Sequence, residues 1–429
     1  MVDKAREIAL KSLYKIDKEE AYSNIVLDEE LKSNRKQLNE KDIGLISQIV
    51  YGVTTWKLTL DTIIEKYSKI KLKKISPWII NILRMGIYQI IFLDKIPKHA
   101  SVDESVNLAK KYGNKGSIGF VNAVLRKVSK EDYDELFKIE NKIEKISKTR
   151  SMPVWIIEEL LKNNTIEEVD KICENLNLKP ELCVRINRLK TNKEELTEKL
   201  TEKGIESKEG RIDGFLILKN VKNLDNLAEF KEGLFTVQDE SAGLTAIVLN
   251  PKSGENVLDA CSAPGGKTTH IAEIMNNTGS IEAWDIYEHR INLIKQNCER
   301  LGITIVNTKL QDASQKNELE NDKYDKILLD VPCLGIGVIK RKPDIKWKRK
   351  KEDVDEISKI QYEILENCSK YLKENGELVY STCSILQEEN ELLIEKFIKN
   401  NSKFEMIKMD KIQPNEEQDG FFICKLKRV

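Results

Sequence analysis

Short apolar runs alternate with helical segments through residues 256–381, and this alternation constrains the fold more than any other feature. The helical segments, 267–275, 287–301 and 357–372, carry apolar side chains at helical spacing. Such alternation predicts a doubly wound, parallel α/β sheet whose ligand site lies at the carboxyl ends of its strands. The expected strands are 256–260, 280–284, 305–309, 326–330 and 377–381.

The first 130 residues have a different pattern, with helical spacing throughout and no strand-like alternation. The most apolar run, 78–93, contains Asn81, Arg84 and Gln89 and is too short to span a bilayer, so we expect a buried helix. Residues 150–235 combine helical segments with two short strand-like runs. We therefore expect three domains: a helical domain at 1–135, a small α/β linking module at 150–235, and the α/β domain at 236–429.

Charge is balanced overall but unevenly distributed along the chain. The 71 basic and 71 acidic residues argue against a histone-like protein, yet residues 53–130 hold fifteen basic and five acidic side chains. A solvated lysine-rich surface and a phosphate-binding face both fit that excess. The run 340–351 has eight basic residues and one acid, and we expect it to be a phosphate clamp, with Trp347 as a core anchor. An exposed, charged helix start is the alternative.

The numbers and spacing of cysteines and histidines indicate whether the chain holds a metal site and whether its thiols are free. None of the eight cysteines forms a C-x-x-C pair, and there are three histidines, so we expect no metal site. The N-terminus carries charges every few residues and lacks an apolar signal region. We accordingly expect free thiols, no membrane association and a cytoplasmic protein, and we expect a monomer.

The strongest local signal is a strand that runs into a Gly-Gly turn and then a helix, at residues 257–270. Glycines let the backbone approach a ligand, and the helix N-terminus offers free N–H donors. Asp285 ends the next strand, where a carboxylate can accept from ribose hydroxyls, and Asp312 follows the third strand, within reach of an adenine amine. A dinucleotide or an adenosyl group such as S-adenosylmethionine fits, although the G-x-G-x-x-G spacing of dinucleotide sites is missing.

Two cysteines follow neighbouring strands of the expected sheet. Cys333 comes after Asp330-Val331-Pro332, and Cys383 after Tyr380-Ser381-Thr382. Catalytic groups gather at such strand ends, whereas inert cysteines usually lie inside elements, as Cys173, Cys298 and Cys368 are expected to. A thiolate that adds to carbon 6 of a pyrimidine makes carbon 5 nucleophilic enough to take a methyl group from a sulfonium. Asp330 is placed to stabilise charge at N3 of the base.

These motifs resemble those of the RNA cytosine-5 methyltransferases, over roughly residues 230–429. The similar segments are DACSAPGGKTTH, DVPC, KRKPDIKW, YSTCSILQEENE, DGFFICKL and the earlier QDESA. Residues 96–127, including the segment FVNAVLRK, resemble the helical RNA-binding domain of antitermination factor NusB. A NusB-like domain joined to a Rossmann-like methyltransferase domain is similar to the bacterial RsmB (Sun/Fmu) type, which methylates cytosine in 16S ribosomal RNA.

The resemblance implies a role for each matching residue. Cys383 would be the nucleophile, Cys333 would assist release of the methylated base, and Asp330 would face the base. The residues implied in S-adenosylmethionine binding are Cys261, Ser262, Ala263, Pro264, Gly265, Gly266, Lys267, Asp285, Asp312 and Asp330. Leu334 and Ile336 stand where small or hydroxyl residues are usual in this family, and Gln387 where proline is common, so the local shape of the base pocket depends on them.

Three other functions remain open on the sequence alone. The same chemistry could act on transfer RNA. A non-catalytic RNA-binding assembly factor could keep both domains, although intact Cys383, Cys333 and Asp330 argue against it. A nicotinamide oxidoreductase would need the glycine spacing that the chain lacks.

Overall fold

The computed structural model describes residues 2–19, 21–316 and 322–429. It divides into two compact units, each made of two stretches of chain. Unit 1 comprises Met1–Asn177 and Ile339–Lys350, and unit 2 comprises Leu178–Val338 and Lys351–Val429. This division is coarser than the three domains expected from the sequence, whose limits stay a prediction. None of the described helices has the length and apolar character needed to span a membrane.

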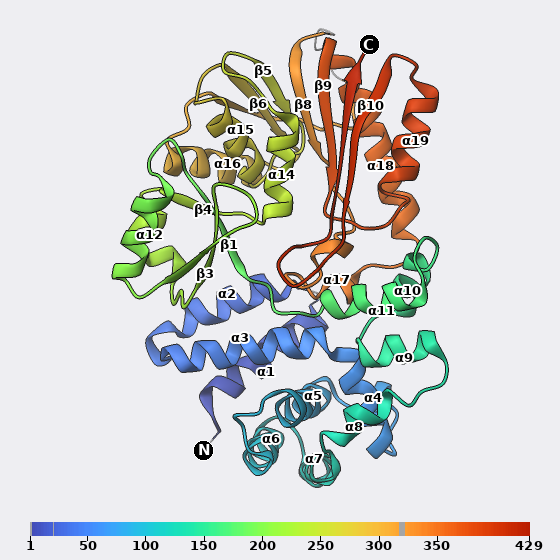
Figure 1. Cartoon of the computed structure of the whole chain (residues 1–429). Coiled ribbons are helices and arrows are strands. Elements are labelled where there is room, and N and C mark those ends of the chain that lie inside the picture. Colours follow the sequence, from blue (N-terminus) through green and yellow to red (C-terminus); the bar gives the residue numbers. More distant parts are fainter. Residues whose placement is uncertain (1, 20, 317–321) are drawn as a thin grey trace. The chain divides into compact units, whose positions relative to one another are not determined.

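Unit 1 is helical, and its core forms around α5 (Pro77–Phe92) (Figure 1). Helix α5 starts at Pro77, with the Ser76 hydroxyl accepting from the Ile79 amide, and it is buried on most sides, as the sequence predicted. The first helices are α1 (Lys4–Lys18), α2 (Ser23–Asn34), α3 (Glu40–Thr55), α4 (Lys57–Tyr67), α6 (Lys98–Tyr112) and α7 (Lys115–Lys127). Those that follow are α8 (Glu131–Leu136), α9 (Lys142–Thr149), α10 (Val154–Leu160) and α11 (Ile166–Asn175).

Residues Ile339–Lys350, which we call the inserted segment, leave unit 2 after Val338 and pack into unit 1. The Lys346 Nζ is buried and donates to Thr55 O at 3.0 Å, Ser151 O at 3.1 Å and Asn177 Oδ1. Trp347 Nε1 donates to Thr54 O at 2.6 Å from the short helix α17 (Ile345–Lys348).

Two of the eight basic residues of the run 340–351, Lys340 and Lys346, are buried, and Lys346 donates to three protein oxygens. The predicted phosphate clamp is therefore corrected for these two residues, and for the exposed Lys342, Lys350 and Lys351 it stays a prediction. Asp344 lies in the same segment and accepts from Ser23 N at 3.2 Å and from the Ser23 hydroxyl, at the start of α2. The hydrogen bond of Trp347 is consistent with its expected role as a core anchor.

Unit 2 begins with a small antiparallel sheet in the order β2-β3-β1-β4. Helix α12 packs its apolar face against this sheet. The two strand-like runs of the sequence, 183–186 and 215–218, therefore both form strands. The elements are β1 (Leu182–Ile186), α12 (Lys193–Glu202), β2 (Glu206–Glu209), β3 (Phe215–Lys219), α13 (Ala228–Lys231) and β4 (Phe235–Val237).

The second sheet of unit 2 has seven strands in the order β10-β11-β9-β8-β5-β6-β7. Strands β5 to β9 run parallel at the five predicted positions, and they form the Rossmann-like core. They are β5 (Asn256–Asp259), β6 (Ser280–Asp285), β7 (Val306–Leu310), β8 (Tyr324–Asp330) and β9 (Leu372–Thr382).

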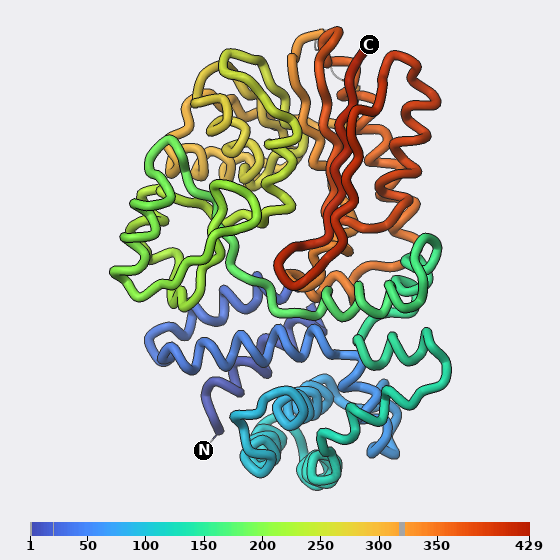
Figure 2. Tube along the Cα trace, in the orientation of Figure 1, coloured from blue at the N-terminus to red at the C-terminus, as the bar shows by residue number. Residues whose placement is uncertain are grey.

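The sheet is mixed rather than wholly parallel, which corrects one expectation. The C-terminal hairpin of β10 (Phe404–Ile412) and β11 (Phe421–Arg428) adds two antiparallel strands beside β9 (Figure 2). A hairpin reverses chain direction within a few residues, so its second strand cannot join as a parallel neighbour. Most side chains of β10 are exposed at the sheet edge, and a register shift between Met406 and Lys408 interrupts the alternation of apolar and polar residues along it.

Helices cover both faces of the seven-stranded sheet (Figure 1). Alternate residues of each strand point to opposite faces, so that Val257 packs with one helical layer and the neighbouring Leu258 with the other. One layer contains α14 (Glu240–Leu249), α15 (Gly266–Ile274) and α16 (Glu288–Leu301). The other contains α18 (Asp353–Cys368) and α19 (Glu391–Asn400).

Candidate active site at the carboxyl ends of the parallel strands

The loop from Cys261 to Lys267 joins β5 to α15 at the carboxyl edge of the sheet. The Ser262 amide and hydroxyl both donate to Trp284 O, at 2.9 and 2.7 Å, which holds the loop against β6. Gly265 has a φ of 99°, a left-handed conformation that favours glycine, and it caps the start of α15. Ala263 and Pro264 are joined by a cis peptide bond, and the Asn297 amide donates to Pro264 O at 2.8 Å.

The two predicted ribose and adenine carboxylates lie in different surroundings. Asp285 ends β6 and is buried, and its Oδ1 accepts from the Tyr287 amide at 3.0 Å. Asp312 lies two residues beyond β7 and is exposed, and its Oδ1 accepts from Ser314 N and Oγ at 2.9 and 2.7 Å. Both residues therefore lie at the predicted edge of the sheet, but only Asp285 is buried there.

An ion pair connects the loop to the end of β8. Lys267 Nζ donates to Asp330 Oδ2 at 2.7 Å, and Ser381 Oγ of β9 donates to Asp330 Oδ1 at 2.8 Å. Burial opposes the charge of Lys267, but the Asp330 carboxylate outweighs burial and raises the pKa of Lys267 above its ordinary value. The Lys267 ammonium also lies 5.3 Å from the centre of the Phe421 ring.

The two strand-end cysteines meet at this edge. Cys333 Sγ and Cys383 Sγ are 2.8 Å apart, and both residues are free thiols that are neither fully buried nor exposed. The hydrogen bond with Cys383, together with burial, raises the pKa of Cys333 well above the usual thiol value. The negative charge of Cys383, when ionised, acts on Lys267, so an ammonium faces one member of the pair. Cys173, Cys298 and Cys368 lie buried within helices, as the sequence predicted.

One further carboxylate lies under the loop. Asp259 is fully buried at the end of β5, and burial raises its pKa to about 7 although Thr268 Oγ1 donates to its Oδ2 at 2.7 Å. Its Oδ1 is buried without a hydrogen-bond partner. A buried acceptor of this kind has unused capacity for a hydrogen bond.

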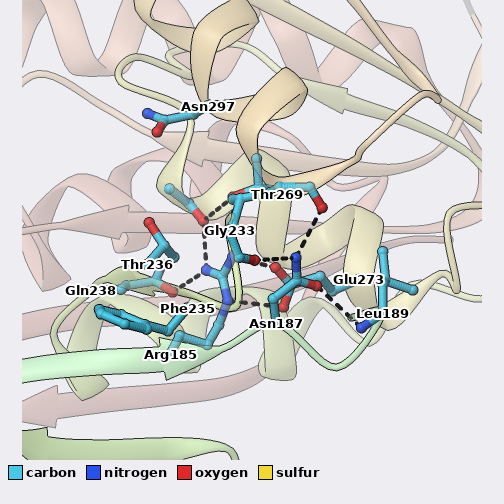
Figure 3. Close-up of polar contacts among 12 residues, drawn as sticks. Arg185, Asn187, Leu189, Gly233, Phe235, Thr236, Gln238, Thr269, Glu273 and Asn297 are labelled. Carbon is cyan, nitrogen blue, oxygen red and sulfur yellow. Dashed lines mark hydrogen bonds and ion pairs between the residues drawn. The ribbon is translucent and has the colours of Figure 1, made fainter. Parts of the chain in front are cut away.

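The floor of the loop is an arginine that sequence reasoning did not single out. Arg185 of β1 is buried and makes a two-pronged ion pair with Glu273 of α15, at 2.8 and 3.1 Å (Figure 3). The same guanidinium donates to Gly266 O at 2.8 Å, to Thr269 Oγ1 at 3.1 Å and to Gln238 Oε1. Arg185 thus holds the first turn of α15 in place. Its partner Gln238 is the first residue of the QDESA segment, which resembles the family's segment before the cofactor loop.

The segment after Cys333 is tightly packed against the Cys383 loop. Gly337 N donates to Cys383 O at 3.0 Å, and a Cβ on Gly337 would lie 2.1 Å from Gly420 O, so no larger residue fits. Leu334 and Ile336, which depart from the usual family pattern, are buried in the protein. Their side chains therefore contribute to packing, and Gln387 lies half-buried at the turn after β9.

Comparison with known proteins identifies the family. A model of 16S rRNA methyltransferases of the RsmB/F type matches residues 246–427, a NusB model matches 3–130, and a ferredoxin-like domain model of RsmF/B-like methyltransferases matches 152–223. A probable ribosomal RNA small subunit methyltransferase B of Bacillus subtilis (strain 168) is 37% identical over 444 residues, which cover 99% of this chain and 98% of that protein. The chain belongs to this methyltransferase family.

Further relatives agree with that assignment. The ribosomal RNA small subunit methyltransferase B of Escherichia coli O7:K1 is 32% identical over 402 residues, covering 91% of this chain and 92% of that one. The crystal structure of PH0851 superposes with a TM-score of 0.82 at 27% identity, over the full length of both chains. As a member of this family, the chain catalyses S-adenosylmethionine-dependent methylation of ribosomal RNA.

The residues at the loop fit S-adenosylmethionine. A nearby Cβ on Gly266 would meet nothing closer than Gln238 Nε2 at 3.8 Å, so the backbone at the start of α15 is open to a ligand. The free N–H groups there, the Asp285 carboxylate and the unpaired Asp259 Oδ1 supply both donors and acceptors. No group of three or more metal-ligating side chains occurs among residues 2–19, 21–316 and 322–429.

Proposed function

We propose that the chain methylates carbon 5 of a cytosine in 16S ribosomal RNA through a covalent bond between Cys383 and carbon 6. The observation that carries this proposal is the cysteine pair, with 2.8 Å between Sγ atoms, beside the Lys267–Asp330 ion pair. Carbon 5 of a cytosine is a weak nucleophile, so a methyltransferase that acts there needs a group that adds to carbon 6. Two thiols and an acid at one strand edge supply such groups.

The proposed first step is attack by Cys383. Its thiolate forms the S–C6 bond, and the π electrons of C5–C6 move toward N3, where a proton or hydrogen bond must balance the charge. We assign N3 to Asp330, which Lys267 and Ser381 hold at this edge. The proton that N3 takes up passes through Asp330 from the paired Lys267 ammonium.

The second thiol acts after carbon 5 has been methylated. S-Adenosylmethionine supplies an electrophilic methyl group when it is bound. Loss of the carbon 5 proton then returns its electrons to the ring, restores C5=C6 and expels the Cys383 thiolate. Cys333 assists this release, because its raised pKa keeps it a thiol that can give its proton to the departing Cys383 sulfur and take up the carbon 5 proton in exchange. We propose that Cys261–Lys267, Asp285, Asp312 and Asp330 hold the cofactor.

The proposed substrate and setting follow from the family. The matching models describe 16S rRNA methyltransferases and NusB proteins, and the lysine excess of residues 53–130 would bind the RNA backbone. We propose that the chain acts as a monomer in the cytoplasm, where ribosomal RNA is assembled.

Two single-cysteine variants test the proposal, because they should have opposite phenotypes. Cys383→Ala should abolish methylation and form no protein–RNA adduct. Cys333→Ala should methylate the base but release it slowly, so a species that resists denaturing electrophoresis and disappears with nuclease should accumulate. Cys298→Ala, in a buried helix position, is the matched control and should behave as wild type.

The double variant and the modified base complete the test. Cys333→Ala/Cys383→Ala should form no adduct, and bisulfite sequencing of the 16S RNA should report a protected cytosine with the wild type and Cys298→Ala but not with Cys383→Ala or the double variant. An adduct in Cys383→Ala and none in Cys333→Ala would show that the roles are reversed. Full methylation by Cys383→Ala would show that the covalent mechanism is wrong.

A further inference from the structure

The two cysteine loops share one buried carboxylate, that of Glu389. Glu389 is fully buried in the turn between β9 and α19, although it lies in the acidic run Gln387–Asn390. Its main chain is held as well, because Tyr380 Oη donates to Glu389 O at 2.7 Å. A buried carboxylate that accepts several hydrogen bonds is costly to desolvate, so its partners indicate what it organises.

Each oxygen of the carboxylate serves a different loop. Glu389 Oε2 accepts from Leu334 N at 2.9 Å, and Leu334 directly follows Cys333. Glu389 Oε1 accepts from the hydroxyl of Ser384, which directly follows Cys383. A single side chain therefore contacts the residue next to each thiol.

A glutamine adds a second link to the Cys333 loop. Gln361 Nε2 of α18 donates to Glu389 Oε2 at 3.0 Å and to Pro332 O at 2.9 Å. The residues on both sides of Cys333 are thus fixed through one cluster. The charge of Glu389 also contributes to the raised pKa of Cys333, after the hydrogen bond from Cys383 and burial.

We propose that Glu389 is the positioning residue that sets the separation of the Cys333 and Cys383 thiols. In this role it acts through the Leu334 amide and the Ser384 hydroxyl. The expected effect of Glu389 on methylation rests on the proposed function. Its effect on the separation of the two thiols does not. Loss of the carboxylate would remove the side-chain link between the two loops, leaving the Gly337 N–Cys383 O hydrogen bond, and would leave the Leu334 amide without its buried acceptor.

The first test needs no RNA. Diamide oxidises two neighbouring thiols to a disulfide and is itself reduced to the hydrazine, so the rate of Cys333–Cys383 crosslinking, followed by mass spectrometry of the full chain, reports thiol separation. Glu389→Gln, which replaces an acceptor oxygen by a donor, should slow crosslinking about tenfold or more. Glu395→Gln, at an exposed position of α19, is the matched control and should crosslink as wild type.

A shorter acid separates position from charge. Glu389→Asp keeps the charge but is too short to reach both loops, so it should crosslink as slowly as Glu389→Gln. The pH midpoint of Cys333 alkylation by iodoacetamide should fall in Glu389→Gln, where the nearby negative charge is lost, and stay nearer to wild type in Glu389→Asp. A purely structural role would not separate the two variants in this way.

Methylation kinetics supply the catalytic readout. We expect kcat to fall at least tenfold in Glu389→Gln, while KM for RNA and the affinity for S-adenosylmethionine change less than twofold. Ser384→Ala removes the Cys383-side contact alone, and it should show an intermediate crosslinking rate even if Glu389→Gln does not fold.

The outcomes can be told apart. Wild-type crosslinking in folded Glu389→Gln, or in Ser384→Ala if Glu389→Gln does not fold, would overturn the inference. Slow crosslinking with unchanged methylation would keep the positioning role of Glu389 and contradict the proposed function of the cysteines.

Discussion

Lys267 Nζ lies 2.7 Å from Asp330 Oδ2, so an ion pair joins the first turn of α15 to the end of β8. Both side chains are mostly buried, with exposed fractions of 16% and 27%. The pair is therefore largely shielded from solvent, and removal of either charge should affect the other.

Asp330→Asn should lower methylation at least about 100-fold, because an amide at this position cannot pass a proton to N3 of the base. The same change should destabilise the protein by about 2 kcal/mol, since the Lys267 ammonium keeps a buried position without its partner. Steady-state kinetics and urea unfolding measure the two effects. Asp325→Asn, at the other end of β8 and paired with Lys373, should leave kcat unchanged. Wild-type kcat in Asp330→Asn would contradict its assignment.

Asp285→Ala should weaken S-adenosylmethionine binding by about 2–3 kcal/mol, because the ribose hydroxyls lose a charged acceptor. Isothermal titration calorimetry with the full chain measures the change. Asp103→Ala, at an exposed position of α6, is the control and should bind as wild type. Unchanged affinity in Asp285→Ala would remove Asp285 from the cofactor site.

Lys346→Met should change how stability depends on pH. Burial lowers the pKa of Lys346 to about 7 in the folded chain, below the ordinary lysine value of 10.5. Between these two values the unfolded chain binds more protons than the folded chain, so the free energy of unfolding of the wild type should rise as the pH rises. Methionine has no titrating group, and the variant should lack this rise.

Chemical denaturation at pH 6, 8 and 10 measures that difference. Lys342→Met, at an exposed position of the inserted segment, should keep the wild-type profile. Parallel pH profiles for Lys346→Met and the wild type would show that the Lys346 pKa is not lowered.

The lysines between α4 and α5 should bind RNA phosphates. Lys69, Lys71, Lys73 and Lys74 are all exposed and lie within six residues of one another. Replacing all four with glutamine should weaken 16S RNA binding and reduce the slope of log K against log salt by roughly 3, at about 0.7 per phosphate contact on single strands. Filter binding over a salt series gives the slope. An unchanged slope would exclude these lysines from the RNA contact.

The parts of the fold that the sequence predicted are those with a strong local signal. The five parallel strands are apolar, and Gly265 must adopt a positive φ at the loop, so both could be read directly. Strand β9 begins at Leu372, five residues before its predicted start, because the preceding helix stops at Cys368. Strand β10 was missed because the adjacent apolar residues Met406 and Ile407 lie at a register shift, which breaks the two-residue alternation.

Candidate site residues could be predicted only where a chemically reactive residue type stands at the end of an expected strand. Cys333, Cys383 and Asp330 end apolar strands, and the structure brings them together. Glu389 and Lys346 were missed because acidic and basic runs usually mark solvated surface, whereas here one member of each run is buried. Their partners are main-chain groups and side chains distant in sequence, and no local pattern reports such contacts.

Because of the inserted segment, the helical unit is encoded by two separate stretches of the gene. Lys346, Trp347 and Asp344 bind Thr55 O, Thr54 O and the start of α2, yet the chain reaches them only after it has left β8. A gene fragment that encodes residues up to Asn177 therefore omits the hydrogen-bond partners of Thr54, Thr55 and Ser23. Exchange of helical units between relatives by recombination must transfer two separate stretches of gene, and the loop that carries Cys333 borders the second of them.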